Sequence, residues 1–257
     1  MNNDLTWLDD HTFRVGDTEF ALMRDLDDLH ARESTGDCFV LGKNRRLVDD
    51  LLEMRETANI RRIVDLGIFK GGSMALYALI FEPLKLVGIE YATDVVQPLR
   101  DFIDRHDLAE RVQPYYGVNQ ADDARVRAIV EGEFAGADID LIVDDASHYY
   151  FETRASFNTL FPYLSPNGLY VLEDWGWAHW PGDLWQKSQA FDAVRPALSN
   201  FVFELCMLSA SRPDLVESVH VTFNSCVVRR GAGELPRGPF KIENCYLTRN
   251  RWFKPSM

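Results

Sequence analysis

Short apolar runs alternate with amphipathic stretches from about Arg61 onward. Short apolar runs are typical of buried strands, and amphipathic stretches are typical of helices that cover a sheet. We predict strands at 61–67, 85–91, 111–117, 138–146 and 168–175. We predict helices near 72–82, 94–105, 121–132, 150–163 and 183–197. This alternation indicates repeated βα units around a mostly parallel sheet.

The pattern changes after the last of these helices. The runs FVFELCML (201–208) and SVHVTFNSCVVRR (218–230) both have the character of strands, and the segment between them is too short for a helix. Strands joined so closely must pair antiparallel. We therefore expect an α/β, Rossmann-like three-layer sandwich whose seven-stranded, mostly parallel sheet ends in an antiparallel hairpin. A dinucleotide-binding dehydrogenase would instead continue with parallel crossovers.

Three regions are expected along the chain. With 257 residues, 46% of them apolar, the chain can bury one substantial core. Residues 61–231 form this core domain. Residues 1–60 form an N-terminal extension with a small hairpin around Val15-Gly16-Asp17 and a helix near 43–57. Residues 232–257 form a C-terminal extension, and either extension could cover a site or contact another subunit.

The charge and the cysteines restrict the ligands and the compartment. The chain has 27 basic and 40 acidic residues, a net charge of −13, which disfavours nucleic acid and anionic membranes as partners. The N-terminal sequence MNNDLTWLDD lacks the apolar run of a signal peptide, and no segment is long enough to span a bilayer. We expect a cytoplasmic protein with small-molecule ligands. Its four cysteines lack the spacing of a zinc site or a disulfide framework; they are Cys38, Cys206, Cys226 and Cys245.

A glycine-rich turn follows the first predicted strand. The sequence DLGIFKGGS occupies residues 65–73 and leads directly into a predicted helix. Glycines let the backbone approach a ligand closely, and the amides at a helix start can hold a carboxylate. The second strand ends in Glu90, whose side chain can accept hydrogen bonds from both hydroxyls of a ribose. The two features together predict a nucleoside site, although the turn alone also fits a tight strand–helix junction that binds nothing.

Acidic residues end the next two strands. LIVDDASH (141–148) ends the fourth strand and YVLEDW (170–175) ends the fifth. Carboxyl ends of parallel strands meet at one edge of a sheet, so Asp145, Glu173 and Asp174 should converge there. Three carboxylates repel one another unless a cation joins them, and oxygen ligands suit a hard divalent ion such as Mg²⁺. Taken alone, such acidic residues could equally be solvated loop residues or helix caps.

His148 lies three residues after Asp145. A histidine has an ordinary pKa near 6.5 and can accept a proton close to pH 7, so His148 is a candidate general base. A lone histidine is more often structural, but its spacing from Asp145 at a strand end favours the base. Asp144 should point away from Asp145, and it either faces the nucleoside or caps the following helix.

The glycine turn resembles the first motif of class I S-adenosylmethionine-dependent O-methyltransferases, in the G-x-x-x-G-G-S form of the macrolide-sugar and cephalosporin hydroxylase-related group. The chain departs from the commoner G-x-G form because Phe69 occupies the middle glycine position. The five βα units with a terminal hairpin are similar to the strand succession of this class. The resemblance implies that residues 61–231 bind S-adenosylmethionine. The cofactor-binding residues it implies are Asp65, Gly67, Ile68, Gly71, Gly72, Ser73, Glu90, Tyr91, Asn119, Gln120 and Asp144.

The acidic motifs carry the same resemblance. D-x-x-H followed by E-D at the next strand end is similar to the metal and base arrangement of the macrolide-sugar O-methyltransferases. This implies Asp145, Glu173 and Asp174 as metal ligands and His148 as base. Catechol-type O-methyltransferases have an acidic residue and an Asp-Asn pair at matching points, where this chain has Glu173-Asp174. The likeness lies in motifs over most of residues 60–230, so the substrate does not follow from it.

Four tryptophans follow the acidic motif within EDWGWAHWPGDLW: Trp175, Trp177, Trp180 and Trp185. Their flat surfaces could line an acceptor pocket, as carbohydrates and polycyclic ligands often require. They could equally pack a helix onto the sheet or form a subunit contact. The nearby His179 could be a second base or a substrate contact, although an incidental role is favoured. Tyr149 and Tyr150 could line the pocket or pack a helix.

The sequence therefore predicts an S-adenosylmethionine-dependent, divalent-metal-assisted O-methyltransferase. Its substrate would be a hydroxylated small molecule, such as a sugar of a natural product, and we expect a homo-oligomer. A metal cation would favour loss of the hydroxyl proton and align the oxygen with the methyl group. Two alternatives stay open: a metal-independent methyltransferase whose carboxylates bind a cationic acceptor, and a catalytically silent nucleoside-binding protein with a role in an assembly.

Overall fold

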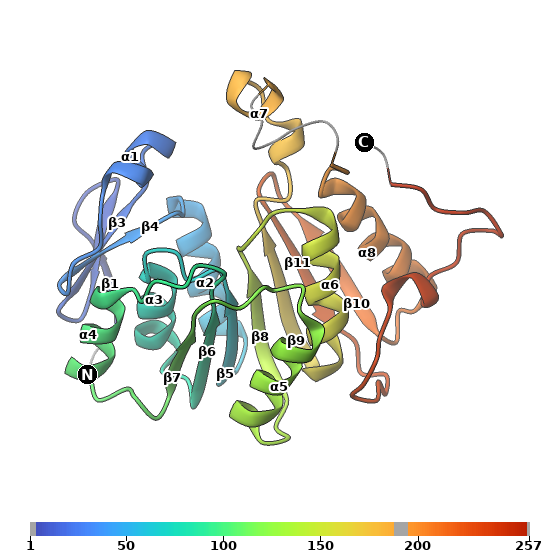
Figure 1. The fold of residues 1–257 in the computed structure, drawn as a ribbon, viewed down its shortest axis with the longest axis horizontal. Helices are drawn as coiled ribbons and strands as arrows, with labels where there is room; N and C mark the ends of the chain where they lie inside the picture. Colours follow the sequence, from blue (N-terminus) through green and yellow to red (C-terminus); the bar gives the residue numbers. More distant parts are fainter. Residues whose placement is uncertain (1–3, 188–194, 256–257) are drawn as a thin grey trace. The chain divides into compact units, whose positions relative to one another are not determined.

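The computed structural model describes residues 4–187 and 195–255 of the chain. The chain divides into two compact units, Met1–Gly117 and Val118–Met257, which are taken in turn (Figure 1). The three-part division predicted from the sequence, 1–60, 61–231 and 232–257, stays a prediction. No helix in the described part of the chain is both long enough and apolar enough to cross a membrane.

The first unit begins with a small sheet of four strands in the order β1-β2-β3-β4. Strands β1, β2 and β3 are antiparallel neighbours, and β4 pairs parallel to β3. The predicted hairpin is β2–β3, with Gly16 at φ 62° in its turn. The flanking strands β1 and β4 are additions that the sequence analysis missed. The strands are β1 (Leu5–Trp7), β2 (Thr12–Val15), β3 (Thr18–Leu22) and β4 (Cys38–Leu41).

Two helices accompany this sheet. Helix α1 (Leu26–Ala31) connects β3 to β4 and begins after Asp25, whose side chain accepts a hydrogen bond from the Asp28 amide. Helix α2 (Arg45–Thr57) matches the helix predicted near 43–57. The Asn44 side chain caps α2 by accepting from the Leu47 amide at 3.1 Å. Such caps satisfy amides that have no partner inside the helix.

Three parallel strands and two helices complete the first unit. Strand β6 (Lys85–Ile89) pairs with β5 (Arg62–Leu66) on one side and β7 (Val112–Tyr115) on the other. Helices α3 (Gly72–Phe81) and α4 (Gln97–Arg105) connect them. Nine of the ten residues of α3 are buried, so this helix is a core element rather than an amphipathic cover.

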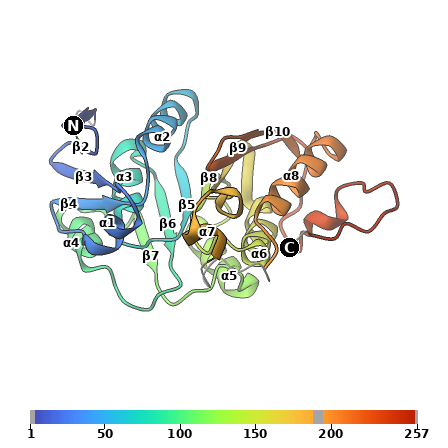
Figure 2. The ribbon, with the colours of Figure 1, turned by 90° about the horizontal axis from the view of Figure 1, so that it is seen from above.

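The second unit continues the alternation. Strand β8 (Ile139–Asp144) pairs parallel to β9 (Leu164–Glu173), and α6 (Tyr150–Leu160) and the 3₁₀ turn η1 (Phe161–Tyr163) connect them. Helix α5 (Asp123–Phe134) precedes β8. Strand β9 pairs antiparallel with β11 (Ser225–Arg230), which pairs antiparallel with β10 (Val216–Val221). Figure 2 shows α5, α6 and α8 (Ser199–Ser211) together on one side of these strands.

The predicted fold class is confirmed in its elements: five strands that pair in parallel fashion, then an antiparallel hairpin. One segment of that prediction was wrong. Residues 201–208 belong to helix α8 (Ser199–Ser211), not to a strand. The reason is their spacing, because the buried Phe201, Leu205 and Leu208 recur at helical intervals, which a continuous apolar run conceals.

The hairpin lies entirely within residues 216–230, because the run that we took for a single strand turns back on itself at 222–224. The Thr222 amide donates to the Ser225 carbonyl at 2.8 Å, and the Ser225 amide donates to the Thr222 hydroxyl at 3.2 Å. Of the helix predicted at 183–197, α7 (Asp183–Lys187) is present and 195–197 are not helical. Residues 188–194 lie outside the described part.

Candidate functional site

The glycine turn after β5 has a backbone conformation that would let a ligand approach its main-chain atoms closely. Gly67 and Gly71 have φ of 99° and 83°, conformations that favour glycine. A Cβ on Gly72 would lie 2.3 Å from the Val40 carbonyl oxygen, so only glycine fits there. Beneath the turn, the Ser73 hydroxyl donates to the fully buried Asp65 carboxylate at 2.6 Å. Asp65 thus supports the turn from the end of β5, and its predicted contact with the cofactor stays a prediction.

The start of α3 is suited to an anionic ligand group. Among the described residues no side chain caps this helix, whose N-cap is Gly71. The first amides of a helix lack partners inside it and attract negative charge. A cofactor carboxylate would supply the missing acceptor. The glycine turn therefore fits the predicted cofactor.

Glu90 ties the end of β6 to the glycine turn. Its carboxylate accepts from the Phe69 amide and from the Ala92 amide, each at 2.8 Å. Each carboxylate oxygen has more than one lone pair, so Glu90 can still accept hydrogen bonds from ribose hydroxyls. The neighbouring Tyr91 is 76% exposed, whereas Ile68 is buried, and the predicted cofactor contacts of both stay predictions.

Lys70 connects the glycine turn to the N-terminal extension. Its ammonium donates to the carbonyls of Leu29 at 2.9 Å and His30 at 3.3 Å, and also to the Arg32 carbonyl. These carbonyls end α1, where a positive charge interacts favourably with the helix dipole. Glu33 adds an ion pair at 3.2 Å. The sequence analysis assigned no role to Lys70.

The substitution Lys70→Met should weaken cofactor binding. It keeps the length of the side chain but removes the contacts that hold the turn, so the ligand must order the turn when it binds. We expect the Kd for S-adenosylhomocysteine, measured by calorimetry, to rise by about 3- to 10-fold. The exposed Lys241 is the matched control, and Lys241→Met should leave the Kd unchanged. Equal affinity of Lys70→Met and wild type would contradict this role.

Gln120 and Asp144 form a buried network. The Gln120 amide nitrogen donates to Asp144 at 3.1 Å, and its oxygen accepts from the Ser147 amide at 2.9 Å. Asp144 also accepts from the hydroxyls of Ser156 and Tyr170, each at 2.7 Å. Burial raises the pKa of Asp144, and these hydrogen bonds partly oppose the shift.

These contacts show that Asp144 faces the interior, so it does not act as a simple exposed cap. The network supports the loop 145–149 from below. Asn119 is exposed, and its side chain accepts from the Ala121 amide at 2.9 Å. The predicted cofactor contacts of Asn119, Gln120 and Asp144 stay predictions. Ser156 and Tyr170, which hold Asp144, were missed because their partners are distant in sequence.

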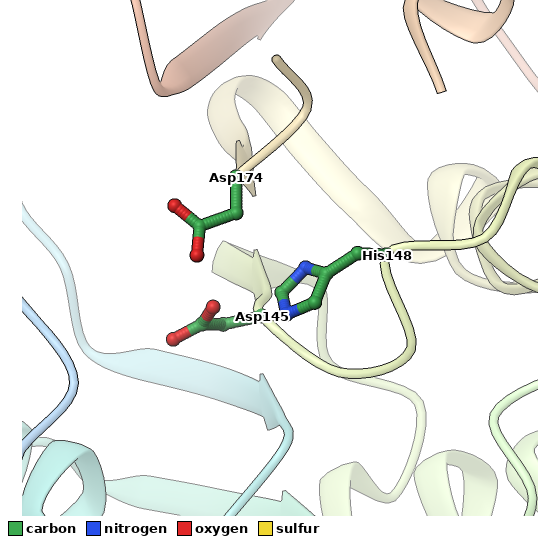
Figure 3. Close-up of side chains that lie close together, drawn as sticks. All are labelled: Asp145, His148 and Asp174. Carbon is green, nitrogen blue, oxygen red and sulfur yellow. The ribbon is translucent and has the colours of Figure 1, made fainter. Parts of the chain in front are cut away.

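Three predicted residues converge at the ends of β8 and β9. Asp145, His148 and Asp174 each offer one ligand atom, and these atoms all lie within 4.8 Å of one another. Figure 3 shows the imidazole and the two carboxylates turned toward one another. All three residues are half-buried. The His148 Nδ1 atom is buried and has no hydrogen-bond partner among the described residues. Two carboxylates beside an imidazole are a donor set that fits a divalent cation.

Glu173 lies outside this group of three. It is the last residue of β9, is 3% exposed and pairs with Ser225 of β11. The structure therefore brings together two of the three predicted carboxylates and adds His148 to them. The role of Glu173 as a ligand stays a prediction.

His148 and Asp174 both have a left-handed backbone, with φ of 56° and 52°. This conformation is uncommon for residues other than glycine, although histidine and aspartate adopt it more readily than most. It costs about 1 kcal/mol or more per residue and persists only where neighbouring groups enforce it. Strained backbone at two of three converging residues is typical of a functional site.

Comparisons with known proteins were made in sequence and in structure. No family model matches the sequence. The chain is 32% identical over 112 residues to 8-demethyl-8-alpha-L-rhamnosyl tetracenomycin-C 2'-O-methyltransferase of Streptomyces olivaceus, covering 43% of this chain and 26% of that protein. It is 29% identical over 129 residues to mycinamicin VI 2''-O-methyltransferase of Micromonospora griseorubida, covering 47% and 29%. The chain thus matches less than a third of these relatives' own length.

Solved structures supply the fold. MycE methyltransferase from the mycinamycin pathway, solved with Mg and SAH, has a TM-score of 0.52 and 21% identity over 75% of this chain and 51% of its own. The O-methyltransferase TomG from Streptomyces achromogenes, solved with SAM, has a TM-score of 0.54 and 16% identity over 74% and 82%. The fold is that of a Rossmann-like methyltransferase. The resemblance inferred from the motifs is also confirmed, because both relatives in sequence are named O-methyltransferases, one of them of a rhamnosyl tetracenomycin.

Proposed function

We propose that this protein is an S-adenosylmethionine-dependent, divalent-metal-assisted O-methyltransferase that acts on a hydroxyl of a sugar or another part of a natural product. The observation that carries the proposal is the convergence of Asp145, His148 and Asp174 within 4.8 Å. The glycine turn and Glu90 support the cofactor. The relatives' names support the acceptor class, because one relative acts on a rhamnosyl tetracenomycin and another on an olivosyl-oleandolide.

Bound S-adenosylmethionine would supply an electrophilic methyl group, and a divalent cation would supply positive charge that favours loss of the hydroxyl proton. The backbone of Gly67, Gly71 and Gly72 would bind the cofactor carboxylate at the start of α3. The Glu90 carboxylate would accept hydrogen bonds from the ribose hydroxyls. The remaining contacts that we propose are those of Asp65, Ile68, Ser73, Tyr91, Asn119, Gln120 and Asp144.

The three converging side chains divide the work at the acceptor. Asp145 and Asp174 would hold the cation, with Glu173 as a further proposed ligand. His148 would accept the proton of the acceptor hydroxyl at a ring nitrogen, because its imidazole lies beside both carboxylates. A base held next to the cation removes the proton where the positive charge most favours its loss.

Removal of divalent ions should stop methyl transfer. After exhaustive chelation, transfer of labelled methyl groups to a panel of glycosylated and phenolic acceptors should fall by about 100-fold or more, and Mg²⁺ should restore it. Full activity after chelation would disprove the metal role and favour a metal-independent transferase. Cofactor binding without transfer to any acceptor would instead favour the catalytically silent alternative.

Two features of the whole protein belong to the same proposal. We infer a cytoplasmic enzyme, and the net charge of −13 supports the further inference that it has no nucleic-acid or membrane partners. We also infer a homo-oligomer, and light scattering of the purified protein would measure its mass in solution.

A further inference from the structure

His148 and Asp174, the two left-handed residues at the proposed metal site, are each held by a hydrogen bond to a backbone atom. The Trp177 indole nitrogen donates to the His148 carbonyl at 2.9 Å. The Asp174 amide donates to the Asn224 carbonyl at 2.6 Å. Trp175, the next residue, donates from its indole nitrogen to the Thr222 carbonyl at 2.9 Å. The segment 174–177 is thus bonded to the loop of His148 on one side and to the β10–β11 turn on the other.

Gly176 shows how closely this segment approaches the turn. A Cβ at this position would lie 2.7 Å from the Phe223 carbonyl oxygen and 3.1 Å from the Trp180 indole nitrogen. No side chain fits there without a shift of the backbone. The Trp175 indole therefore bonds to the β10–β11 turn and the Trp177 indole to the His148 loop. Gly176 lies between them, where this segment contacts the backbone of the turn.

Trp177 is too deeply buried to line an acceptor pocket. Its side chain is only 4% exposed, so it has no open face for a ligand. Trp180 and Trp185, later in the same loop, pack edge to face with 4.8 Å between ring centroids. Trp175 and Trp177 thus each donate a hydrogen bond to a backbone carbonyl, and Trp177 is too buried to offer a flat binding surface.

We propose that Trp177 is a positioning residue, which holds His148 in the left-handed conformation that turns its imidazole toward Asp145 and Asp174. Trp175 and Gly176 do the same for Asp174 through the β10–β11 turn. The inference rests on the proposed function for the identity of the site. Residues that orient the groups around a metal commonly change activity by about 10- to 100-fold when they are replaced.

The test is Trp177→Phe, which keeps an aromatic ring but removes the N–H donor. We expect kcat to fall by about 10- to 100-fold while KM for S-adenosylmethionine changes by less than about twofold. The His148 ring signal in a spectrum of the ¹³C-histidine-labelled protein should shift or broaden, since the ring loses its fixed orientation. Trp7→Phe, the same change in strand β1, is the matched control and should alter neither quantity.

A second measurement avoids the risk that Trp177→Phe fails to fold. In the wild type, the indole N–H of Trp177 should exchange with deuterium far more slowly than that of Trp252, which is 91% exposed. Exchange of both at the same rate would overturn the inference. So would a Trp177→Phe variant with an unchanged His148 signal and wild-type kcat. If the wild type transfers no methyl group, the proposed function fails, but the exchange and spectral tests still decide this one.

Discussion

Asp145→Asn should abolish methyl transfer and leave cofactor binding intact. Asparagine has nearly the same shape as aspartate, but it lacks the negative charge that the proposed cation requires. Asp145 is one of only two carboxylates among the three converging residues, so its loss halves the negative charge there. A bound metal contributes several kcal/mol to stabilisation of a transition state, so kcat should fall by about 1,000-fold or more.

Three measurements separate this effect from loss of folding. The melting temperature and the Kd for S-adenosylhomocysteine should stay close to the wild-type values, because Asp145 is not among the proposed cofactor contacts and asparagine keeps nearly the same shape. The affinity for Mn²⁺, followed by electron paramagnetic resonance, should fall sharply. Asp104→Asn, on the exposed face of α4, is the control. Wild-type Mn²⁺ affinity in Asp145→Asn would refute the role of Asp145 as a ligand.

Element types from residue 61 to about 175 could be predicted because each carries its own local signal. Strands β5, β6 and β8 are short apolar runs that end in a turn or a charged residue, and α4 has an apolar face at helical spacing. Asp145 follows β8 and Asp174 follows β9, and these two strands are parallel neighbours whose carboxyl ends lie side by side. The convergence of Asp145 with Asp174 could therefore be inferred from the order of elements alone. The same inference needs no knowledge of side-chain conformation.

The wrong predictions concern segments whose secondary structure depends on contacts with residues distant in the sequence. Residues 201–208 are apolar on nearly every position, so periodicity cannot distinguish a strand from a buried helix. In the structure the segment is part of helix α8, whose buried Glu204 accepts hydrogen bonds from the Tyr246 hydroxyl at 2.9 Å and from Arg154 at 3.0 Å. Both partners are far away in sequence. The turn at Asn224 was likewise hidden within a longer apolar run.

Glu173 and Asp174 show a further limit of strand-end reasoning. Successive residues of a strand point to opposite faces, so two adjacent carboxylates cannot both reach one ion from a regular strand. In the structure β9 ends at Glu173, and Asp174 follows in a left-handed conformation and is the one of the two that joins Asp145 and His148. The Asp174 amide donates to the Asn224 carbonyl in the β10–β11 turn, some fifty residues later in the chain. No local pattern around Asp174 encodes it.

His148→Asn should lower kcat by about 100- to 10,000-fold while metal binding is largely retained. Asparagine tolerates the left-handed backbone that His148 adopts, so the loop keeps its shape. Its amide cannot accept a proton at neutral pH, so the variant isolates the role of the base.

The affinity for Mn²⁺ distinguishes a base from a ligand at this position. If His148 acts as the base, His148→Asn should bind Mn²⁺ within about threefold of the wild type, whereas Asp145→Asn should not. A loss of Mn²⁺ affinity as large as that of Asp145→Asn would instead make His148 a ligand and leave the proton to another acceptor. Since the three side chains lie within 4.8 Å of one another, comparison of the two variants is what assigns each its part in the reaction.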